Sequence, residues 1–198
     1  MRNLIFFLLL IAAFPACDNQ KPATPQNLDL EGFTIQDIPG SDLKRATLRD
    51  VKGKILEEGT IKDGRKHGMW TTYHKERDVI ATIGSFVNGV PNGPAYEFGE
   101  YGHLEKISNF TNNVQDGRFV TMKNTHKIEE GNYVMGILEG NYKKYYPNTD
   151  KVQQEMNYKH NKLDGDLIYY NPNGEVTIKY VYKDGEKLSG GMVEAPQH

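Results

Sequence analysis

Residues 59–73 read GTIKDGRKHGMWTTY, and this order of residue types decides the fold because it recurs along most of the chain. An aromatic or aliphatic residue stands three positions before a glycine or asparagine, and the pattern returns at steps of 25, 24, 23, 25 and 24 residues. Six copies at a nearly constant spacing indicate a repeat architecture. The apolar residue of this pattern is Ile61, Phe86, Phe110, Tyr133, Tyr158 and Tyr182 in the six copies.

Each copy combines a tight turn with flanking segments typical of β-strands. Glycine and asparagine tolerate positive φ, which favours a chain reversal between the two segments. The segment before the turn alternates in polarity, most clearly over residues 176–183, as a strand with one apolar face does. Each copy is therefore predicted to be a β-hairpin. A second glycine follows in five copies, at Gly68, Gly93, Gly117, Gly140 and Gly165, whereas the sixth copy has Ser189 there, followed by Gly190 and Gly191.

The hairpins predict an all-β fold, a single-layer antiparallel β-hairpin repeat array of about six repeats and roughly twelve strands. Trp70 and Tyr73 stand three residues apart in the second strand of the first copy. This spacing places them on opposite faces unless a β-bulge intervenes, and the sequence leaves that point open. The predicted segments are a signal peptide at 1–16, a modified Cys17 with a flexible tether at 17–32, an N-terminal cap at 33–48, the repeats at 49–191 and a tail at 192–198.

The text of residues 59–73 resembles the longer MORN-type repeat, in which glycine, an aromatic residue, Asn/Asp-Gly, a further glycine, Trp and Tyr follow in order. The resemblance covers about residues 49–191, and the copy at 131–146 matches nearly as well. MORN families imply an extended sheet used for protein or lipid contact, without a catalytic site. Bacterial proteins with such repeats often carry an antitoxin label. The copies near residues 84 and 108 depart from the pattern: Ala95 and Phe119 replace Trp, Phe98 and Met122 replace Tyr, and Asn113 replaces glycine.

The N-terminus is typical of an export signal. Arg2 precedes an apolar run from Leu4 to Phe14, which is too short to cross a bilayer at about 1.5 Å per residue but suits a secretory signal. The following Phe14-Pro15-Ala16-Cys17 resembles the lipobox of bacterial lipoproteins, which implies lipidation of Cys17. Two or three acyl chains would anchor a domain stably to a membrane. An ordinary secreted protein with an incidental cysteine is the alternative.

Composition excludes several classes of function. Lys and Arg total 24, Asp and Glu total 26, and both signs are scattered, so no basic field is available for nucleic acid. A single cysteine forms no internal disulfide and no cysteine cluster for zinc.

The sequence contains no set of residues whose spacing predicts a catalytic site. The neighbouring acids Glu57-Glu58 and Glu129-Glu130 point to opposite faces of a strand, so they do not form a paired-carboxylate site. We therefore predict no catalytic residues, no metal and no cofactor. The histidines occupy unrelated repeat positions, which argues against a shared metal site: His67, His74, His103, His126 and His160.

The aromatic residues allow two interpretations. They could form an exposed stripe that binds a ligand, or they could pack on the rings of the next repeat because a single layer has little other core. The second interpretation is favoured. The candidate binding surface consists of Trp70, Tyr73, Phe98, Tyr142, Tyr145, Tyr169 and Tyr170.

These features predict an exported, membrane-anchored, non-enzymatic lipoprotein whose sheet contacts a protein partner in the cell envelope. One alternative is an envelope glycan or phospholipid binder that uses the aromatic residues and the lysines of the C-terminal half. Another is an antitoxin-like member of a toxin–antitoxin pair, which export contradicts unless the toxin is also exported. Edge-to-edge self-association of the open array is a further possibility.

Overall fold

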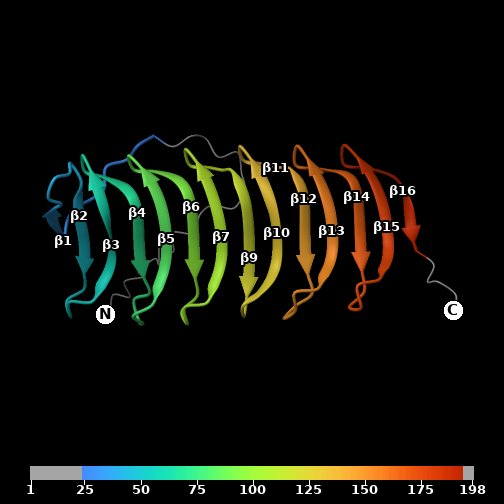
Figure 1. The fold of residues 1–198 in the computed structure, drawn as a ribbon, viewed down its shortest axis with the longest axis horizontal. Helices are drawn as coiled ribbons and strands as arrows, with labels where there is room; N and C mark the ends of the chain where they lie inside the picture. The colour runs from blue at the N-terminus through green and yellow to red at the C-terminus, as the bar shows by residue number, and fades with distance from the viewer. Residues whose placement is uncertain (1–23, 194–198) are drawn as a thin grey trace, which may run out of the picture.

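The computed structural model describes residues 24–193, which form one open antiparallel sheet of 16 strands lying side by side in chain order (Figure 1). No helix long and apolar enough to cross a bilayer occurs among these residues. The strands are β1 Phe33–Asp37, β2 Lys44–Arg49, β3 Ile55–Lys62, β4 Arg65–Tyr73, β5 Ile80–Val87, β6 Val90–Phe98, β7 Leu104–Thr111, β8 Val114–Gln115, β9 Gly117–Lys123, β10 His126–Val134, β11 Ile137–Leu138, β12 Gly140–Tyr145, β13 Val152–Lys159, β14 Lys162–Tyr170, β15 Val176–Lys183 and β16 Glu186–Met192.

From β3 to β16 the sheet consists of six consecutive hairpins, which confirms the predicted repeat array. The second strand of the third copy is divided into β8 and β9, and that of the fourth into β11 and β12. Both breaks precede a glycine with positive φ, Gly117 at 108° and Gly140 at 82°. With each divided strand counted once, the array contains twelve strands. Residues 33–49 add the hairpin of β1 and β2, which extends the sheet beyond β3.

The turns of successive hairpins are tied together by backbone hydrogen bonds. Asp63-Gly64 of the first turn has φ values of 49° and 73°, the left-handed conformation predicted from the sequence. The turn of each later copy donates an N–H to the second strand of the preceding copy: Gly89 to Lys66 at 2.7 Å, Asn113 to Pro91 at 2.8 Å, Gly136 to Gln115 at 2.7 Å, Asn161 to Leu138 at 3.1 Å and Gly185 to Leu163 at 2.8 Å.

A β-bulge near the start of the first strand keeps the copies in the same register. Thr72 lies opposite Thr82 but Tyr73 lies opposite Ile80, so Ala81 is an additional residue on β5. The same shift recurs between β6 and β7, β12 and β13, and β14 and β15. Because these bulges lie on the first strands, β4 alternates without a break from Trp70 to Tyr73. The two aromatic residues therefore lie on opposite faces, which settles the point left open by the sequence.

The face that carries Trp70 contains most of the core, and we call it the core face and the opposite side the outer face. Residues directly opposite each other in a sheet share a face, so the pairing defines a row across the array. In this row Trp70 lies between Gly59 and Gly84, and Met156 lies between Tyr142 and Leu167. Its most buried members, each no more than 6% exposed, are Ala46, Trp70, Ala95, Ser108, Phe119, Met156 and Leu167.

Small residues lie beside several of the rings in this row, since Gly59 and Gly84 flank Trp70 and Gly131 lies opposite Phe119, and this arrangement makes room for the rings within a single layer. A Cβ atom added to Gly59 would lie 2.2 Å from Cε3 of Trp70. At Gly131, an added Cβ atom would lie 2.9 Å from Cε1 of Phe119 and 3.0 Å from Cδ2 of Tyr142. The glycines thus leave the space that the rings of neighbouring strands occupy.

Residues 26–30 lie on the core face at the N-terminal end of the array. Leu28 donates its N–H to the carbonyl of Gly64 at 2.9 Å, and Leu28 and Leu30 pack on the cluster that contains Trp70. The flexible tether predicted for 17–32 is therefore shorter than expected, because these leucines bury apolar surface on the sheet. The earlier part of the tether, including Cys17, lies outside the described residues.

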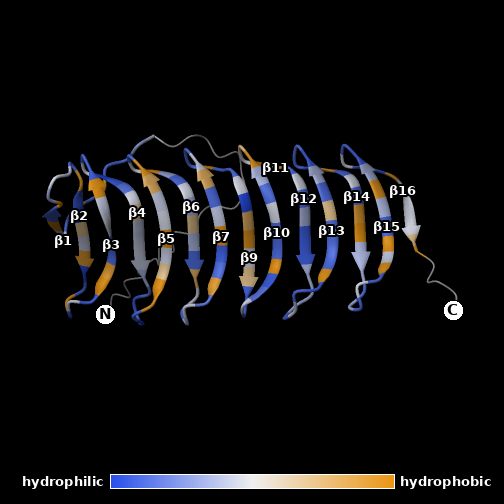
Figure 2. Ribbon diagram, viewed as in Figure 1, coloured by the Kyte–Doolittle hydropathy of each residue, from blue (hydrophilic) through white to orange (hydrophobic). Residues whose placement is uncertain are grey.

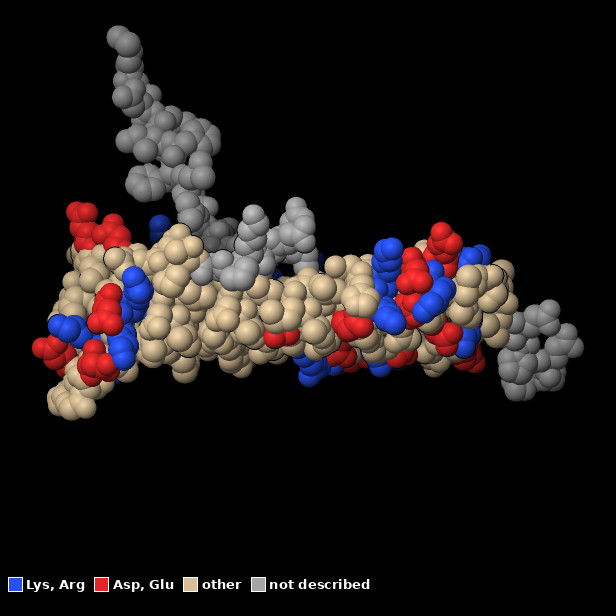
Figure 3. All heavy atoms as spheres, turned by 90° about the horizontal axis from the view of Figure 1, so that it is seen from above, with Lys and Arg blue, Asp and Glu red and all other residues tan. Residues whose placement is uncertain are grey.

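Seen along the strands, the molecule is a long, thin slab (Figure 3). In this view Lys, Arg, Asp and Glu gather at the two ends, whereas the middle is mostly uncharged. The turn sequences explain this distribution. The first and last turns read KDGRK and KDGEK, and the second and third read VNGVPN and TNNVQ.

Candidate interaction surface

An apolar row crosses the middle of the outer face. Ile83 on β5 lies opposite Tyr96 on β6, which lies opposite Ile107 on β7, which lies opposite Val120 on β9. Val120 is 4% exposed, and the other three side chains are half-buried. The row becomes polar at both ends, where Thr71 on β4 lies opposite Ile83 and Glu130 on β10 lies opposite Val120.

A second apolar row runs beside the first, nearer the loops that connect the copies. Ile80 lies opposite Tyr73, and Phe98 lies opposite Leu104, each pair at a β-bulge that turns both side chains to the outer face. All four side chains are half-buried. We call the two rows together the outer patch; its members are Tyr73, Ile80, Ile83, Tyr96, Phe98, Leu104, Ile107 and Val120.

The outer patch is not covered by a second layer of strands. Within residues 24–193, the strands make their main contacts with their neighbours in the sheet, and Leu28 and Leu30 pack on the core face instead. Hydropathy along the ribbon changes at the same place: β9 is hydrophobic over most of its length, whereas β12 is hydrophilic (Figure 2). A continuous apolar area on one face of an open sheet is typical of an interaction site.

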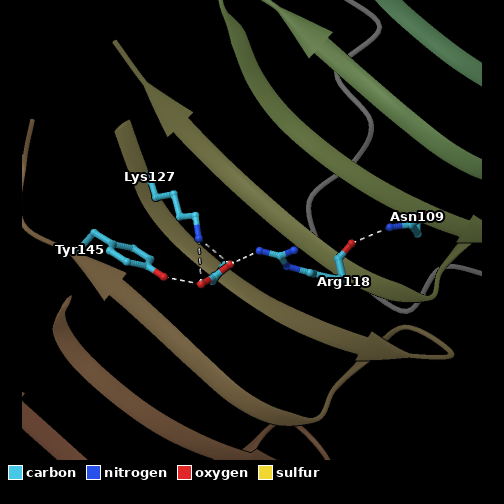
Figure 4. A network of polar contacts seen from close by, with 5 residues as sticks. Asn109, Arg118, Lys127 and Tyr145 are labelled. Atoms are coloured by element: carbon cyan, nitrogen blue, oxygen red, sulfur yellow. Dashed lines mark hydrogen bonds and ion pairs between the residues drawn. The ribbon is translucent and has the colours of Figure 1, made fainter. Parts of the chain in front are cut away.

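The C-terminal border of the outer patch is a polar network centred on Glu130 (Figure 4). The Glu130 carboxylate accepts hydrogen bonds from the Tyr145 hydroxyl, the Arg118 guanidinium and the Lys127 ammonium, the last at 3.3 Å. Lys127 also lies 5.3 Å from the centre of the Tyr145 ring. The backbone carbonyl of Arg118 accepts a 2.7 Å hydrogen bond from the Asn109 amide. Four strands, β7, β9, β10 and β12, supply these residues.

This network keeps Glu130 ionised. Burial by itself raises the pKa of the carboxyl group, but the hydrogen bonds from Tyr145, Arg118 and Lys127 outweigh it and lower the pKa to about 2. Burial and the hydrogen bond to Glu130 raise the pKa of Tyr145, so its hydroxyl remains a donor. The carboxylate is thus a permanent acceptor whose partners hold it in one place.

Ring-to-carboxylate hydrogen bonds recur in other copies and on both faces. On the outer face Tyr73 donates to Glu58 at 2.9 Å and Tyr170 to Glu155 at 3.1 Å. On the core face Trp70 donates to Glu57 at 2.8 Å, and Tyr142 donates to Glu129. Adjacent glutamates therefore lie on opposite faces, as the strand pattern predicted, and each accepts a hydrogen bond from a ring on its own face.

Sequence reasoning did not identify these glutamates as partners of the rings. A signal was present, because Glu-Glu-Gly occurs at both 57–59 and 129–131. In both copies the hydrogen-bonded rings follow their glutamates by 13 and 15 residues. The shared spacing becomes informative once the turn is known to pair the two strands.

The seven aromatic residues of the predicted binding surface do not form one exposed stripe. Trp70, Tyr142 and Tyr169 lie on the core face, while the others lie on the outer face. Trp70 is 2% exposed and Tyr145 is 9% exposed. Several rings of the core face pack on one another, with centroids 5.7 Å apart for Tyr142 and Tyr158 on neighbouring strands, and 6.0 Å for Phe33 and Trp70 and 6.1 Å for Phe119 and Tyr142 across intervening strands. Of the seven, Tyr73 and Phe98 belong to the outer patch.

Lysines of the C-terminal half form ion pairs across neighbouring strands. Lys143 lies 3.4 Å from Glu155, Lys179 lies 2.7 Å from Asp166, and Lys183 lies 2.8 Å from Asp164. This pairing opposes the idea of a lysine-lined face for anionic lipid, because each of these charges is locally balanced. Among residues 24–193, no three His, Cys, Asp or Glu side chains are grouped so that they could hold a metal ion.

Comparison with known proteins adds no family assignment. No family model matches the chain, and a search of curated proteins finds no match.

Proposed function

We propose that this protein is a membrane-anchored, non-enzymatic lipoprotein that uses the outer patch to hold a protein partner in the cell envelope. The single observation that carries the proposal is the outer patch itself, an apolar area on the uncovered side of a one-layer sheet. Its aliphatic and aromatic side chains are those that fill the centres of protein interfaces, while the Glu130 network resembles the polar rim.

The hydrogen-bonded glutamates of the outer face support a structural role and not a catalytic one. Glu58, Glu130 and Glu155 each accept a hydrogen bond from a tyrosine hydroxyl of the facing strand. Groups held in this way stiffen the sheet and position the patch.

Anchoring at Cys17 is the second part of the proposal, and it rests on the lipobox resemblance. Only residues 18–25 separate Cys17 from the segment that packs on the core face, and nine steps of at most about 3.6 Å per residue reach roughly 32 Å. The array would therefore stay close to the membrane surface. Replacing Cys17 by serine is expected to move the protein from the membrane fraction to the soluble fraction and to abolish labelling by a fatty-acid analogue.

A crosslinking experiment tests the protein partner. The full chain with a C-terminal affinity tag is crosslinked in intact cells, purified from detergent-solubilised envelopes and analysed by mass spectrometry. We expect one specific partner with the natural chain, and its loss with Ile107→Lys and with Tyr96→Ala. Thr47→Lys is the matched control, because Thr47 lies in the same outer row beyond the patch, opposite Glu58.

Two results would count against the proposal. One is the absence of any specific partner; the other is equal recovery with all four chains. Circular dichroism and urea unfolding of each variant separate loss of binding from loss of fold. A glycan or vesicle ligand near Trp70 is tested by titrating its fluorescence with cell-wall fragments and anionic vesicles. Because Trp70 is 2% exposed on the core face, a ligand of the outer face is tested separately, by co-sedimentation with the same fragments and vesicles.

A further inference from the structure

The two edges of the sheet differ in how well they are protected. At the N-terminal edge, β1 has five residues and ends at Asp37, which forms an ion pair with Lys44 at 3.1 Å, and Pro39 follows. Short length, charge and proline are common means of preventing unwanted strand pairing. At the C-terminal edge, residues 188–193 carry no charge, and Leu188, Met192 and Val193 are 64%, 87% and 45% exposed.

Backbone groups of β16 point away from the sheet. Val193 donates its N–H to the carbonyl of Thr177 on the β15 side at 2.9 Å. In an antiparallel ladder the residues that bond to one neighbour alternate with those that face the other side. Gly191 therefore faces β15, whereas the N–H and C=O groups of Met192 face outward, away from β15.

The small residues of β16 leave little side-chain bulk at this edge, and a β-bulge at Leu188 shifts its register. Gly190 lies opposite Tyr180 in the core-face row, and Ser189 and Gly191 flank it. Gly84 follows Trp70 and Gly131 follows Phe119 in the same way, whereas Met156 follows Tyr142. A further strand beside Gly190 would meet no side chain from β16 at this position of the row.

We propose that β16 pairs with β16 of a second copy of this chain, which joins two arrays into one continuous sheet. A two-fold axis makes the two identical strands antiparallel, as in the rest of the sheet, and it closes the assembly at two copies. The uncharged stretch from Leu188 to Val193 avoids like-charge repulsion when it faces itself. Head-to-tail growth would require the protected edge at β1.

Two proline variants test this pairing in the full chain. Met192→Pro removes an outward N–H without removing a hydrogen bond to β15, because the Met192 amide faces away from the sheet. Ile35→Pro is the matched control at the other edge. The 3.4 Å hydrogen bond from the Ile38 N–H to the Leu43 carbonyl sets the alternation in β1, so the Ile35 amide also faces outward.

Light scattering in detergent, corrected for bound detergent, gives the protein mass. We expect two copies for the natural chain and for Ile35→Pro, and one copy for Met192→Pro. Hydrogen exchange gives a second readout that is independent of association through the N-terminus. Protection of the peptide covering residues 188–193 is expected to rise with concentration in the natural chain and not in Met192→Pro.

Three outcomes would overturn the proposal. One is a single copy and concentration-independent exchange in the natural chain. Another is an open-ended mass that Ile35→Pro also reduces, because this result means head-to-tail pairing. The third is protection of residues 188–193 only when a different protein is added.

Discussion

The copies that match the repeat pattern and the copies that depart from it share one backbone but present different outer faces. Glu58 and Glu130, in copies that match, occupy the same position as Ile83 and Ile107 in the two that depart. Thr71 and Lys143 likewise correspond to Tyr96 and Val120. The departures thus convert a hydrogen-bonded polar surface into an apolar one over two neighbouring copies. The contrast teaches that turns and glycines maintain the fold, so the outer residues are free to specify function.

The largest expected effect is on the core face of a matching copy. Gly59→Val places side-chain atoms where the Trp70 ring lies, since a Cβ atom alone would approach Cε3 to 2.2 Å. We expect a loss of about 3 kcal/mol in the free energy of unfolding, measured in urea. Gly191→Ala is the control, because nothing lies within 4 Å of its added Cβ atom, and it should change stability by less than about 0.5 kcal/mol. Equal effects would contradict the proposed role of the glycines.

The next largest loss of stability is expected when a residue of a copy that matches the repeat pattern is replaced by the residue at the same position of a copy that departs from it. Glu130→Ile leaves the hydroxyl of the buried Tyr145 and the Lys127 ammonium without their acceptor. We expect a loss of about 2 kcal/mol in the free energy of unfolding. A double-mutant cycle with Tyr145→Phe should give a coupling energy of about 1 kcal/mol. Additive effects would mean that the hydrogen bond contributes nothing, and the exposed Glu100→Gln serves as a control.

A smaller effect is expected from the pH dependence of the stability that Glu130 contributes. The pKa of Glu130 falls from its ordinary 4.5 to about 2 in the folded chain. Its contribution to stability is therefore fully present above pH 4.5 and is lost as the pH falls from 4.5 towards 2. The urea midpoints of the natural chain and Glu130→Gln should differ at pH 7 and converge near pH 2. A constant difference between the two chains would show that ionisation of Glu130 is not the cause.

The smallest effect is expected at the surface of the last two copies. Lys183 lies 2.8 Å from Asp164, which lowers the pKa of Asp164 and raises the pKa of Lys183 through their hydrogen bond. Solvent reaches the Lys183 side chain, which is 55% exposed, and screens this pair, so Asp164→Asn should not measurably change the urea midpoint. A clear loss of stability would contradict this prediction and would mean that the ion pair stabilises the fold as the Glu130 network does.

Much of the fold could be predicted because its signals are local. Turn residues such as Asp63-Gly64 and the alternation over residues 176–183 specify hairpins, and their repetition specifies the array. The aromatic stripe could not be evaluated in the same way. The register of facing strands determines which face a ring occupies and what covers it, and register involves residues of two strands.

The sequence by itself determined that this chain forms an antiparallel array of hairpins, because turn conformation and strand polarity depend on residues a few positions apart. Only the tertiary structure decided that residues 26–30 pack on the core face and that Glu130 is held by Arg118, Lys127 and Tyr145. It also decided that Ile83, Tyr96, Ile107 and Val120 meet in one row. The physical reason is that bulges shift each strand against the next, so the neighbours of a side chain follow from pairing across strands.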